Sequence, residues 1–541
     1  MSEKTRRANY LKQSGIRGMA AWTILLLFLV KIIYMSYQTG MHGMTFYAYA
    51  DAVFMIGYLL FGLAVVPVLK KMVYFQFNHG NYKNTEKVYR VIAGTFTFAI
   101  MVISVLLFLF AEGLSVLFFE TKLCSLIFRF VAVALIFWIP MLSFKGYMEG
   151  IGNAMPGIFA EIIAHLTGLV VTVLTQPAFS EYGRKVAALV RQDSYAYAYS
   201  ACSGALGLAV GGLLGLLFLV MIRSVFGKEI RRRVRSDETR KTDSSQDILW
   251  NFFANYMKTA FIDHIGVILA VILLVMYSHM HGISEKGAGM IYVAMVVPVL
   301  PPALLGWQMA LPFSRQLTNI MKQADFHHAK EKMCFYLKLL SYTILPYFFT
   351  GYALTPLLAK IFFDVESADL PAMMRIGMIS GGLVVYGIFF RQVLTVVVRP
   401  YLRNLCAALL GVSGIGFMFV LKWSGMAGEN CAVYAYLLSC LLFLLLAAFF
   451  VLKRIRIYNR LVESVVLPLV SALFAAAVVF GLFVLLDTKM PEIFVLLLCF
   501  GVAYLTYHLL IAFLQVFQTH EWNDVPAFHI PVSIAKLIGK Y

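Results

Sequence analysis

The stretch Pro67-Val68-Leu69-Lys70, followed by Glu86-Lys87, recurs 245 positions later as Pro312-Phe313-Ser314-Arg315, followed by Glu331-Lys332. Two more basic residues repeat at an offset of 246, since Arg129 and Lys145 recur as Arg375 and Arg391. Unrelated helices have no reason to keep six such positions in register, so the pattern indicates a duplicated helical unit. Duplicated halves around a central site are typical of secondary transporters.

The composition places the chain in a membrane. Hydrophobic residues make up 61% of its 541 positions and charged residues 13%, which excludes an ordinary soluble domain. Within a bilayer, runs of about 20 apolar residues satisfy their backbone groups as α-helices. We therefore predict an all-α polytopic membrane protein with about fourteen spanning helices. The predicted spans are 17–37, 47–69, 91–111, 125–144, 157–175, 197–222, 253–278, 288–313, 335–358, 370–392, 403–421, 431–452, 463–486 and 492–516.

The repeat divides the chain into four predicted parts. They are an N-terminal lobe of six helices (1–222), a basic cytoplasmic linker (223–250), a C-terminal lobe of six helices (251–460), and two extra helices with a cytoplasmic tail (461–541). The linker contains the densest basic cluster, between Lys228 and Lys241. We interpret this cluster as part of the connection between the lobes, and a dock for a partner or a lipid is the alternative.

The distribution of lysine and arginine predicts the orientation. Most of them lie in the terminal segments and in the even-numbered loops, and cytoplasmic loops retain positive charge during insertion. Both termini are therefore expected in the cytoplasm. The net charge of +18 is explained by this topological signal and by attraction to anionic lipids, so no nucleic-acid partner is expected.

Charged residues inside the predicted spans are the candidate functional residues, because each costs about 2.5–3.5 kcal/mol on insertion scales. They are Lys31, Asp51, Arg129, Glu161, Lys258, Asp263 and Arg375. Counting about 1.5 Å per residue, Lys31 and Asp51 reach nearly the same depth in a core about 30 Å thick. Two interpretations stay open: a cation in a cavity that binds substrate phosphate, or a structural ion pair or separate snorkelling.

The other intramembrane cations and acids have weaker assignments. Arg129 and Arg375 occupy equivalent positions near the outer ends of their helices, where they either meet an anionic substrate or snorkel to the headgroups. Lys258 is a further candidate cavity cation that is close enough to the cytoplasmic end to snorkel. Asp263 lies deeper than Lys258 and needs a partner or water.

Glu161 and His165 share one helix face, at the i, i+4 spacing at which a carboxylate holds an imidazole. They form a candidate coupling pair for a proton or another cation. A satisfied polar contact between helices is the alternative. The eighth predicted helix contains Pro298, Pro301 and Pro302, which are expected to bend or unwind it locally.

Motifs for enzyme chemistry are absent from the sequence. There is no GxxxxGK[ST] loop for nucleotide phosphates, no DxD or HExxH motif and no nucleophile elbow, so no catalytic residues are predicted. The seven cysteines have no metal-ligand spacing and are expected to be buried, and no cofactor or metal is predicted. Alternating access driven by the substrate gradient, by H⁺ or Na⁺, or by the membrane potential is the mechanism that fits.

One loop carries a resemblance to a known family. Residues 144–156, FKGYMEGIGNAMP, are similar to the FRGYxQGxGNMxPT run of the multidrug/oligosaccharidyl-lipid/polysaccharide (MOP) exporter superfamily, in its stage V sporulation protein B-like and polysaccharide-transporter branch. The matching residues are Lys145, Gly146, Tyr147, Gly150, Gly152, Asn153 and Pro156, with Lys145 replacing the usual arginine. Pro67 and Lys70 also resemble the end of the second helix of this family, and Lys31 resembles a basic position in its first helix.

The resemblance implies two six-helix lobes plus two C-terminal helices in the bacterial cytoplasmic membrane. It implies a flippase that moves an undecaprenyl-pyrophosphate-linked saccharide, either a polysaccharide repeat unit or the peptidoglycan precursor lipid II, to the outer leaflet. Cavity cations would bind the pyrophosphate. Partners would be membrane lipids and enzymes of cell-wall or polysaccharide synthesis, and we expect a monomer. The alternatives are a cation-coupled drug exporter of the same superfamily and, from another class, a membrane enzyme or scaffold acting on cell-wall lipids.

Overall fold

The computed structural model describes residues 3–238, 242–280, 284–323, 325–364, 368–398, 400–457, 460–486, 489–517 and 521; the side chains of 3–14, 226, 229 and 400 are outside this description. Within these ranges the regular elements are all helices. The chain forms two compact units, Met1–Tyr292 and Val293–Tyr541. The end of the predicted cytoplasmic tail and the last two basic residues of the linker cluster lie outside the described residues.

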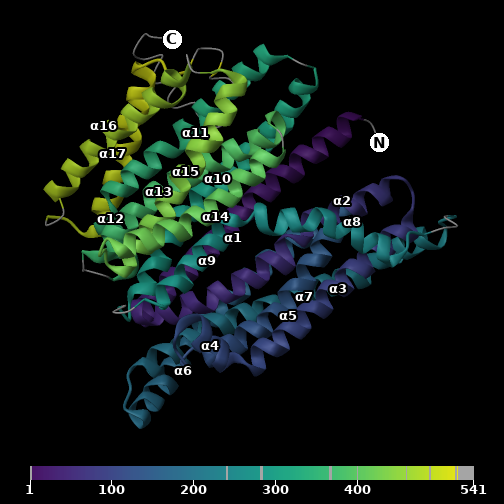
Figure 1. Cartoon of the computed structure of the whole chain (residues 1–541), viewed down its shortest axis with the longest axis horizontal. Coiled ribbons are helices and arrows are strands. Elements are labelled where there is room, and N and C mark those ends of the chain that lie inside the picture. The colour runs from purple at the N-terminus through teal and green to yellow at the C-terminus, as the bar shows by residue number, and fades with distance from the viewer. Residues whose placement is uncertain are drawn as a thin grey trace. The chain divides into compact units, whose positions relative to one another are not determined.

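The first unit is a bundle built around two long antiparallel helices, α6 and α7, with α5 packed along α7 (Figure 1). Its elements are α1 (Glu3–Gly57), η1 (Tyr58–Leu63), α2 (Val65–Asn78), α3 (Tyr82–Leu109), α4 (Ala111–Phe119), α5 (Ser125–Gly150), α6 (Met155–Val190), α7 (Ser194–Arg235), α8 (Ser245–Met257), η2 (Lys258–Ile262), α9 (Ile265–Ser278) and the first residues of α10 (Gly287–Lys322). The predicted linker, 223–250, lies inside this unit. The predicted lobe limits follow the internal repeat rather than compactness, and they stay a prediction.

The second unit packs α13 against α15 and α11, and its last two helices cover α11. Its elements are the remainder of α10, α11 (Phe326–Ala353), α12 (Thr355–Phe363), α13 (Asp369–Val397), α14 (Pro400–Trp423), α15 (Gly428–Ile455), η4 (Val462–Val466), α16 (Leu467–Leu486) and α17 (Glu492–Phe513). Small residues on α16, among them Ala472 and Ala475, allow close packing against Leu339 and Tyr342 of α11. The two extra helices therefore share a buried core with the helices that precede them.

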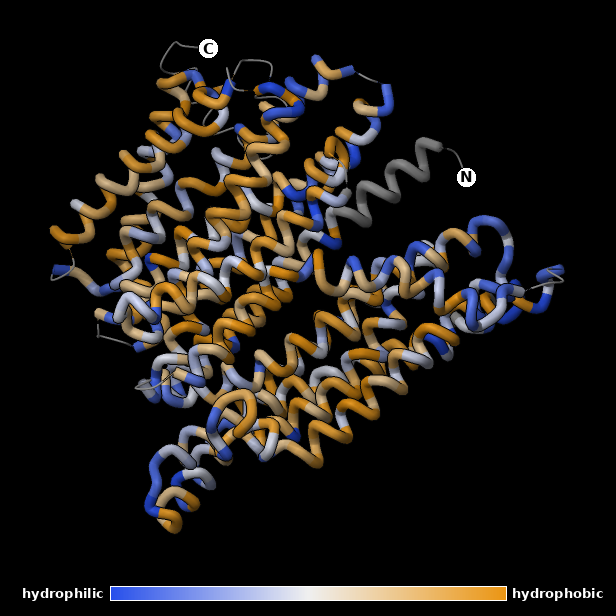
Figure 2. Tube along the Cα trace, in the orientation of Figure 1, coloured by the Kyte–Doolittle hydropathy of each residue, from blue (hydrophilic) through white to orange (hydrophobic). Residues whose placement is uncertain are grey.

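The predicted fold class is confirmed. Eleven helices among the described residues are long and apolar enough to cross a membrane, or thirteen if each of two bent pairs forms one span. One of the eleven is the 64-residue run Gly15–Asn78. At about 1.5 Å per residue this run is long enough for two crossings, and it contains a kink at Gly40, where φ is 63°. Figure 2 shows the apolar middle of the helices and the hydrophilic loops of a multi-pass membrane protein.

Helix interruptions occur beside prolines and polar residues, although not at every proline. The π-helix η1 ends four residues before Pro67, whose ring would clash with the carbonyl group of Leu63 in a regular helix. In the wider turn the carbonyl oxygen of Leu60 remains available as an acceptor, and the Tyr256 hydroxyl donates a hydrogen bond to it. The seventh predicted helix is bent by 55° after η2. By contrast, α10 is uninterrupted at its four prolines, so the expected unwinding of that helix is wrong.

The loop that resembles the MOP exporters forms a tight turn between α5 and α6. A Cβ atom at Gly146 would lie 3.2 Å from the backbone of Val66, which is tighter than most Cβ contacts, so a side chain there would push α5 and α2 slightly apart. Gly152 has a φ of 92°, in the left-handed region that favours glycine. The backbone N–H of Asn153 donates to Met148, 2.9 Å away, and Pro156 lies in the first turn of α6. Much of the motif is therefore explained by this turn and by the close helix contact.

The contact at Gly146 generates a prediction about stability. Gly146→Ala should lower the melting temperature of the purified protein, because overpacking a close contact costs about 1–3 kcal/mol. Gly94→Ala is the matched control in α3, since a Cβ atom there has no neighbour within 4 Å. The control should be neutral or slightly stabilising, because alanine has the higher helix propensity. Equal melting temperatures for the two variants would show that the α2–α5 contact is looser than described.

A buried charged cluster in the first unit

Lys31 and Asp51 both belong to α1, on either side of the kink at Gly40, and both are buried, with exposed fractions of 4% and 3%. The Lys31 ammonium group donates a hydrogen bond to the carbonyl oxygen of Gly204 in α7 at 2.9 Å. The same ammonium group lies 5.1 Å from the ring centroid of Tyr47. Lys31 thus points into the protein and not into lipid.

Asp51 is held from the opposite side. Its Oδ2 atom accepts a hydrogen bond from the Tyr292 hydroxyl at 2.9 Å, and Oδ1 has no hydrogen-bond partner among the described residues. Lys31 and Asp51 attract each other electrostatically without forming a direct ion pair. Tyr47 and Tyr292 meet edge to face, with ring centroids 6.0 Å apart. We call these residues, together with Gly204, the Lys31 cluster.

Glu161 has a different partner from the one that its spacing predicts. Its carboxylate forms an ion pair with Lys145 of α5 at 2.6 Å, and the two side chains are 11% and 15% exposed. The expected Glu161–His165 hydrogen bond is not formed. His165 instead packs its ring against Trp138, with centroids 5.2 Å apart, and it lies within the electrostatic reach of both Lys31 and Lys145. The sequence pattern missed this pairing because Lys145 lies on another helix.

A third buried carboxylate, Glu149, lies at the end of α5 in the same unit. Lys70 of α2 donates a hydrogen bond to it at 2.7 Å, and Arg17 of α1 lies 3.7 Å away. The sequence marked Lys70 by its repeat and Glu149 by its departure from the family motif, but it gave no reason to pair them. Glu149 therefore joins Asp51 and Glu161 as a buried or nearly buried carboxylate that faces a cation from another part of the chain, and Glu86, which pairs with Arg223 of α7, is another.

The other predicted cations lie elsewhere. Arg129 is exposed and stacks over Phe108 at 5.6 Å, and Lys258 is exposed on η2. Neither is part of the Lys31 cluster. Asp263 is partly buried at the bend between η2 and α9. Arg375 belongs to the second unit, where it donates a hydrogen bond to the Thr355 hydroxyl at 3.1 Å.

Arg375 also lines a groove that the sequence did not predict. This groove has a volume of about 640 Å³ between α11, α13 and α16, and its walls are otherwise almost entirely apolar. Phe348 and Tyr386 line it from α11 and α13, and Phe480 lines it from α16 with 49% of its surface exposed. Helices separated by about 100 residues form the walls, so no local pattern could have revealed the groove.

The described residues contain no group of three or more His, Cys, Asp or Glu side chains placed to hold a metal ion. All seven cysteines are buried and free, as predicted from their scattered positions. Pro67 is exposed in the first turn of α2, four residues after the end of η1. Tyr147 of the family motif donates a hydrogen bond from its hydroxyl to Glu86 at 3.1 Å.

No protein-family model and no curated protein sequence matches this chain. The fold is similar to that of the lipid II flippase MurJ in an inward closed conformation, with a TM-score of 0.65 at 13% identity over 92% of this chain and 98% of MurJ. It is also similar to an inward-facing multidrug resistance MATE family transporter of the MOP superfamily, with a TM-score of 0.60 at 13% identity over 81% of this chain and 98% of the transporter. The eukaryotic MATE transporter AtDTX14 follows with a TM-score of 0.51 at 11% identity, over 81% and 98%. The chain therefore has a MurJ/MATE-like fold, and these neighbours are flippases or transporters.

The Lys145–Glu161 pair generates a prediction for a double-mutant cycle. Lys145→Met should lower the melting temperature strongly, because it leaves a nearly buried carboxylate unpaired at a cost of about 3–5 kcal/mol. The double variant Lys145→Met/Glu161→Leu should recover most of this loss, since apolar residues often replace a buried pair without penalty. Lys185→Met is the matched control, because its partner Glu181 is exposed at the surface, and it should melt like the wild type. A double variant no more stable than Lys145→Met would contradict this account of the pair.

Proposed function

We propose that the chain is a flippase that moves an undecaprenyl-pyrophosphate-linked saccharide from the inner to the outer leaflet by alternating access. The support is the MurJ/MATE-like fold, found here in a chain with a lysine buried inside the first unit. A saccharide pyrophosphate cannot cross hydrocarbon unaided, whereas its isoprenoid tail can remain in lipid. Such a protein has to supply a cation for the headgroup and an apolar path for the tail.

The observation that carries the proposal is the bonding of Lys31. An ammonium group has three N–H donors, and the Gly204 carbonyl oxygen is the hydrogen-bond acceptor that Lys31 has among the described residues. Asp51 attracts the ammonium group from a distance and is itself held by Tyr292. A phosphate oxygen can take the remaining donors in charge-assisted hydrogen bonds, which are stronger than neutral ones. Lys31 can therefore bind a phosphate without first separating an ion pair.

The groove beside Arg375 is a separate candidate site for an apolar ligand, within the second unit. Its apolar walls and partly exposed rim suit an isoprenoid chain, which packs against them by van der Waals contact as it does against lipid tails. Arg375 contributes a cation to the same groove. We propose that this groove binds an isoprenoid chain.

Coupling to an ion gradient or to the membrane potential would supply the energy. The sequence contains no nucleotide-binding loop, and a membrane potential supplies about 2.3 kcal/mol per charge per 100 mV. His165 interacts electrostatically with both Lys31 and Lys145, and Glu161 forms an ion pair with Lys145. Both groups therefore lie near the Lys31 cluster. We propose that these groups, and Asp51, respond to a coupling cation such as H⁺ or Na⁺.

The proposal includes a location and partners. The flippase would lie in the bacterial cytoplasmic membrane as a monomer, with both termini in the cytoplasm, as the distribution of lysine and arginine predicts. Its partners would be membrane lipids, the lipid-linked saccharide, and the enzymes that synthesise or polymerise that saccharide. The saccharide is either a polysaccharide repeat unit or a peptidoglycan precursor.

The alternative is a cation-coupled exporter of small cationic compounds. The likeness to two MATE transporters favours it, and so do the buried carboxylates Asp51 and Glu161. Glu161, however, is already paired with Lys145, which leaves Asp51 as the carboxylate to receive a cation. Measurement of cationic dye accumulation in cells separates the two functions, because a lipid flippase leaves dye levels unchanged.

Lys31→Ala is the decisive variant for the proposed function. In proteoliposomes that contain a fluorescent lipid-linked saccharide, this variant should lose at least about tenfold in flipping rate, because one lost charge-assisted contact is worth about 1.5–3 kcal/mol. Lys122→Ala is the control, since Lys122 forms an exposed ion pair with Glu112, and it should flip at the wild-type rate. Wild-type flipping by a well-folded Lys31→Ala protein would remove Lys31 from the mechanism.

The groove generates a separate prediction. Ala477→Trp places a large ring in the groove from an exposed position on α16, so it should slow flipping of a long-chain substrate while the melting temperature is kept. Val484→Trp, at a position on α16 with 60% exposure that does not line the groove, is the control. A substrate with a short isoprenoid tail should be affected less by Ala477→Trp than the long-chain substrate. Equal effects on both substrates would rule out the groove as a tail site.

A further inference from the structure

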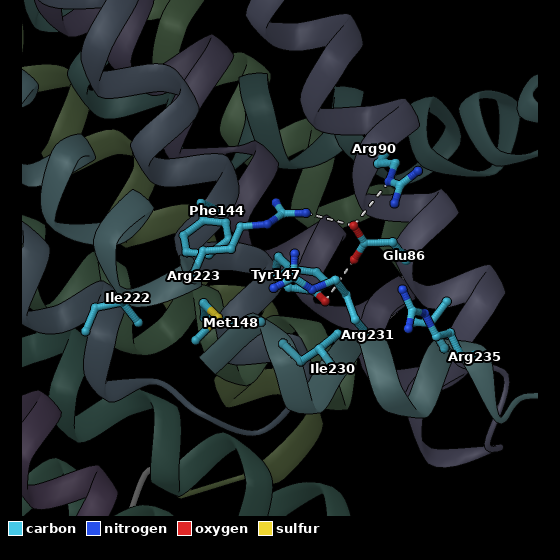
Figure 3. A pocket seen from close by; sticks show the side chains of 12 residues that line it. Glu86, Arg90, Phe144, Tyr147, Met148, Ile222, Arg223, Ile230, Arg231 and Arg235 are labelled. Carbon is cyan, nitrogen blue, oxygen red and sulfur yellow. Dashed lines mark hydrogen bonds and ion pairs between the residues drawn. The ribbon is translucent and has the colours of Figure 1, made fainter. Parts of the chain in front are cut away.

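A pocket of about 300 Å³ lies in the first unit between α3, α5 and α7 (Figure 3). Four arginines line it: Arg90, Arg223, Arg231 and Arg235. The lining contains one carboxylate, that of Glu86, so its formal charge is strongly positive. We call it the arginine pocket.

Two of the four arginines are held in place by Glu86, which is only 8% exposed. One oxygen of Glu86 accepts hydrogen bonds from Arg223 at 2.8 Å and from Arg90 at 3.1 Å, and the other accepts from the Tyr147 hydroxyl. The guanidinium group of Arg223 also lies over the ring of Tyr89, at 5.1 Å from its centroid. This side of the pocket is therefore fixed before any ligand arrives, and its one carboxylate is already used.

The other two arginines retain their binding capacity. Arg231 and Arg235 form no ion pair with any residue that the structure describes, although both line the pocket. Figure 3 shows the guanidinium groups of all four arginines arranged around Glu86. Planar guanidinium groups bind phosphate oxygens with two parallel hydrogen bonds, so this arrangement suits a phosphate better than a single-point anion.

The inner wall of the pocket is apolar. Phe144 and Met148 of α5 form part of it, together with Ile222, Ile230 and Val234 of α7. At Gly227 the wall is bare backbone, and a Cβ atom there would lie 3.9 Å from Arg223 and 4.0 Å from Arg231. A charged rim above an apolar wall matches an amphiphilic ligand, such as a phosphate ester that continues into an apolar chain.

The place of the pocket along α7 fits a lipid headgroup. The predicted span 197–222 ends just before Arg223, and Arg231 and Arg235 follow near the end of α7. These arginines therefore lie at the predicted cytoplasmic end of the helix. Basic pockets between helices on the cytoplasmic side of membrane proteins bind anionic headgroups.

Among the residues that the structure describes, the second half of the chain does not repeat this arrangement. The position equivalent to Glu86 is Glu331, whose side chain is 46% exposed. Its neighbours are His327 at 3.8 Å and His328 at 4.0 Å, and not arginines. A feature that the repeated fold requires would appear in both halves. The arginine pocket is therefore specific to the first half and not required by the fold.

We propose that the arginine pocket binds the phosphate headgroup of an anionic lipid in the leaflet beside the predicted cytoplasmic loops. Arg231 and Arg235 bind the phosphate, Arg223 and Arg90 complete the positive rim, and the apolar wall receives the first part of the chain. This site lies outside the Lys31 cluster and does not depend on which substrate is transported. The phosphate could belong to a bulk phospholipid or to an isoprenoid carrier, and the experiment separates these two sources.

Native mass spectrometry of the full-length protein, released from detergent with added lipid, measures the binding. The probes are phosphatidylglycerol, phosphatidylcholine and undecaprenyl phosphate, each titrated separately. Wild-type protein should retain at least one of the two anionic lipids more tightly than phosphatidylcholine. Tighter binding of phosphatidylglycerol identifies a membrane phospholipid as the ligand, and tighter binding of undecaprenyl phosphate identifies the isoprenoid carrier.

Three variants test the location. Arg231→Gln/Arg235→Gln removes two pocket cations and leaves Glu86 and its partners intact, so it should weaken anionic lipid binding about tenfold or more. Gly227→Leu keeps every charge but fills the pocket, and it should weaken binding as well. The matched control, Lys228→Gln/Arg232→Gln, removes the same charge from the same helix at positions that do not line the pocket.

The control should lose clearly less anionic lipid binding than the Arg231/Arg235 variant, since the two cations that it removes contribute screened surface charge and no direct contact with the headgroup. Equal losses in the control and in the Arg231/Arg235 variant would reduce the effect to general surface charge and overturn the proposal. Unchanged binding by Gly227→Leu would overturn it too, because a filled pocket cannot hold the headgroup. Flipping rates are measured separately, so failure here leaves the proposed transport function standing.

Discussion

An ionised group inside a bilayer costs about 2.5–3.5 kcal/mol on insertion scales, and the partners of the charged groups in the first unit lower this cost. Glu149 is held by Lys70, Glu161 by Lys145, and Asp51 by Tyr292 with Lys31 nearby. Each carboxylate meets a partner from another helix or from the far side of a kink, so the charges also tie the bundle together.

Local sequence patterns predicted the parts of this structure that depend on one segment. Apolar runs gave the spans. The equal depth of Lys31 and Asp51 in the membrane stays a prediction, and both residues are buried in the first unit. The partner of Glu161 could not be read this way, because Lys145 lies on the other side of the α5–α6 turn and the i, i+4 neighbour His165 was the nearer choice. Prolines were equally ambiguous: Pro67 is preceded by a π-helix, whereas the prolines of α10 leave that helix uninterrupted. The groove beside Arg375 required three helices to come together and had no local signal.

The internal repeat preserves positions more faithfully than it preserves their contacts. Arg129 is an exposed residue over Phe108, whereas its counterpart Arg375 is partly buried, bonds to Thr355 and lines a groove. Glu86 gathers two arginines and a tyrosine, whereas Glu331 is exposed. A duplicated scaffold that keeps its helices in register can thus acquire different sites in its two halves. For this reason symmetry in the sequence is strong evidence for the fold and weak evidence for a shared role.

The three lysines that reach into the helix bundles differ in how they are bonded, and this difference singles out Lys31. Lys145 and Lys338 form direct ion pairs, with Glu161 at 2.6 Å and with Glu521 at 2.9 Å. Removing either lysine from its pair leaves an unpaired carboxylate at a cost of about 3–5 kcal/mol, which opposes any ligand that would take the cation. Lys31 is bonded to a neutral carbonyl oxygen, and Asp51 keeps the Tyr292 hydrogen bond whatever Lys31 does. Of these three lysines, only Lys31 can therefore turn toward an incoming anion without breaking an ion pair with a carboxylate.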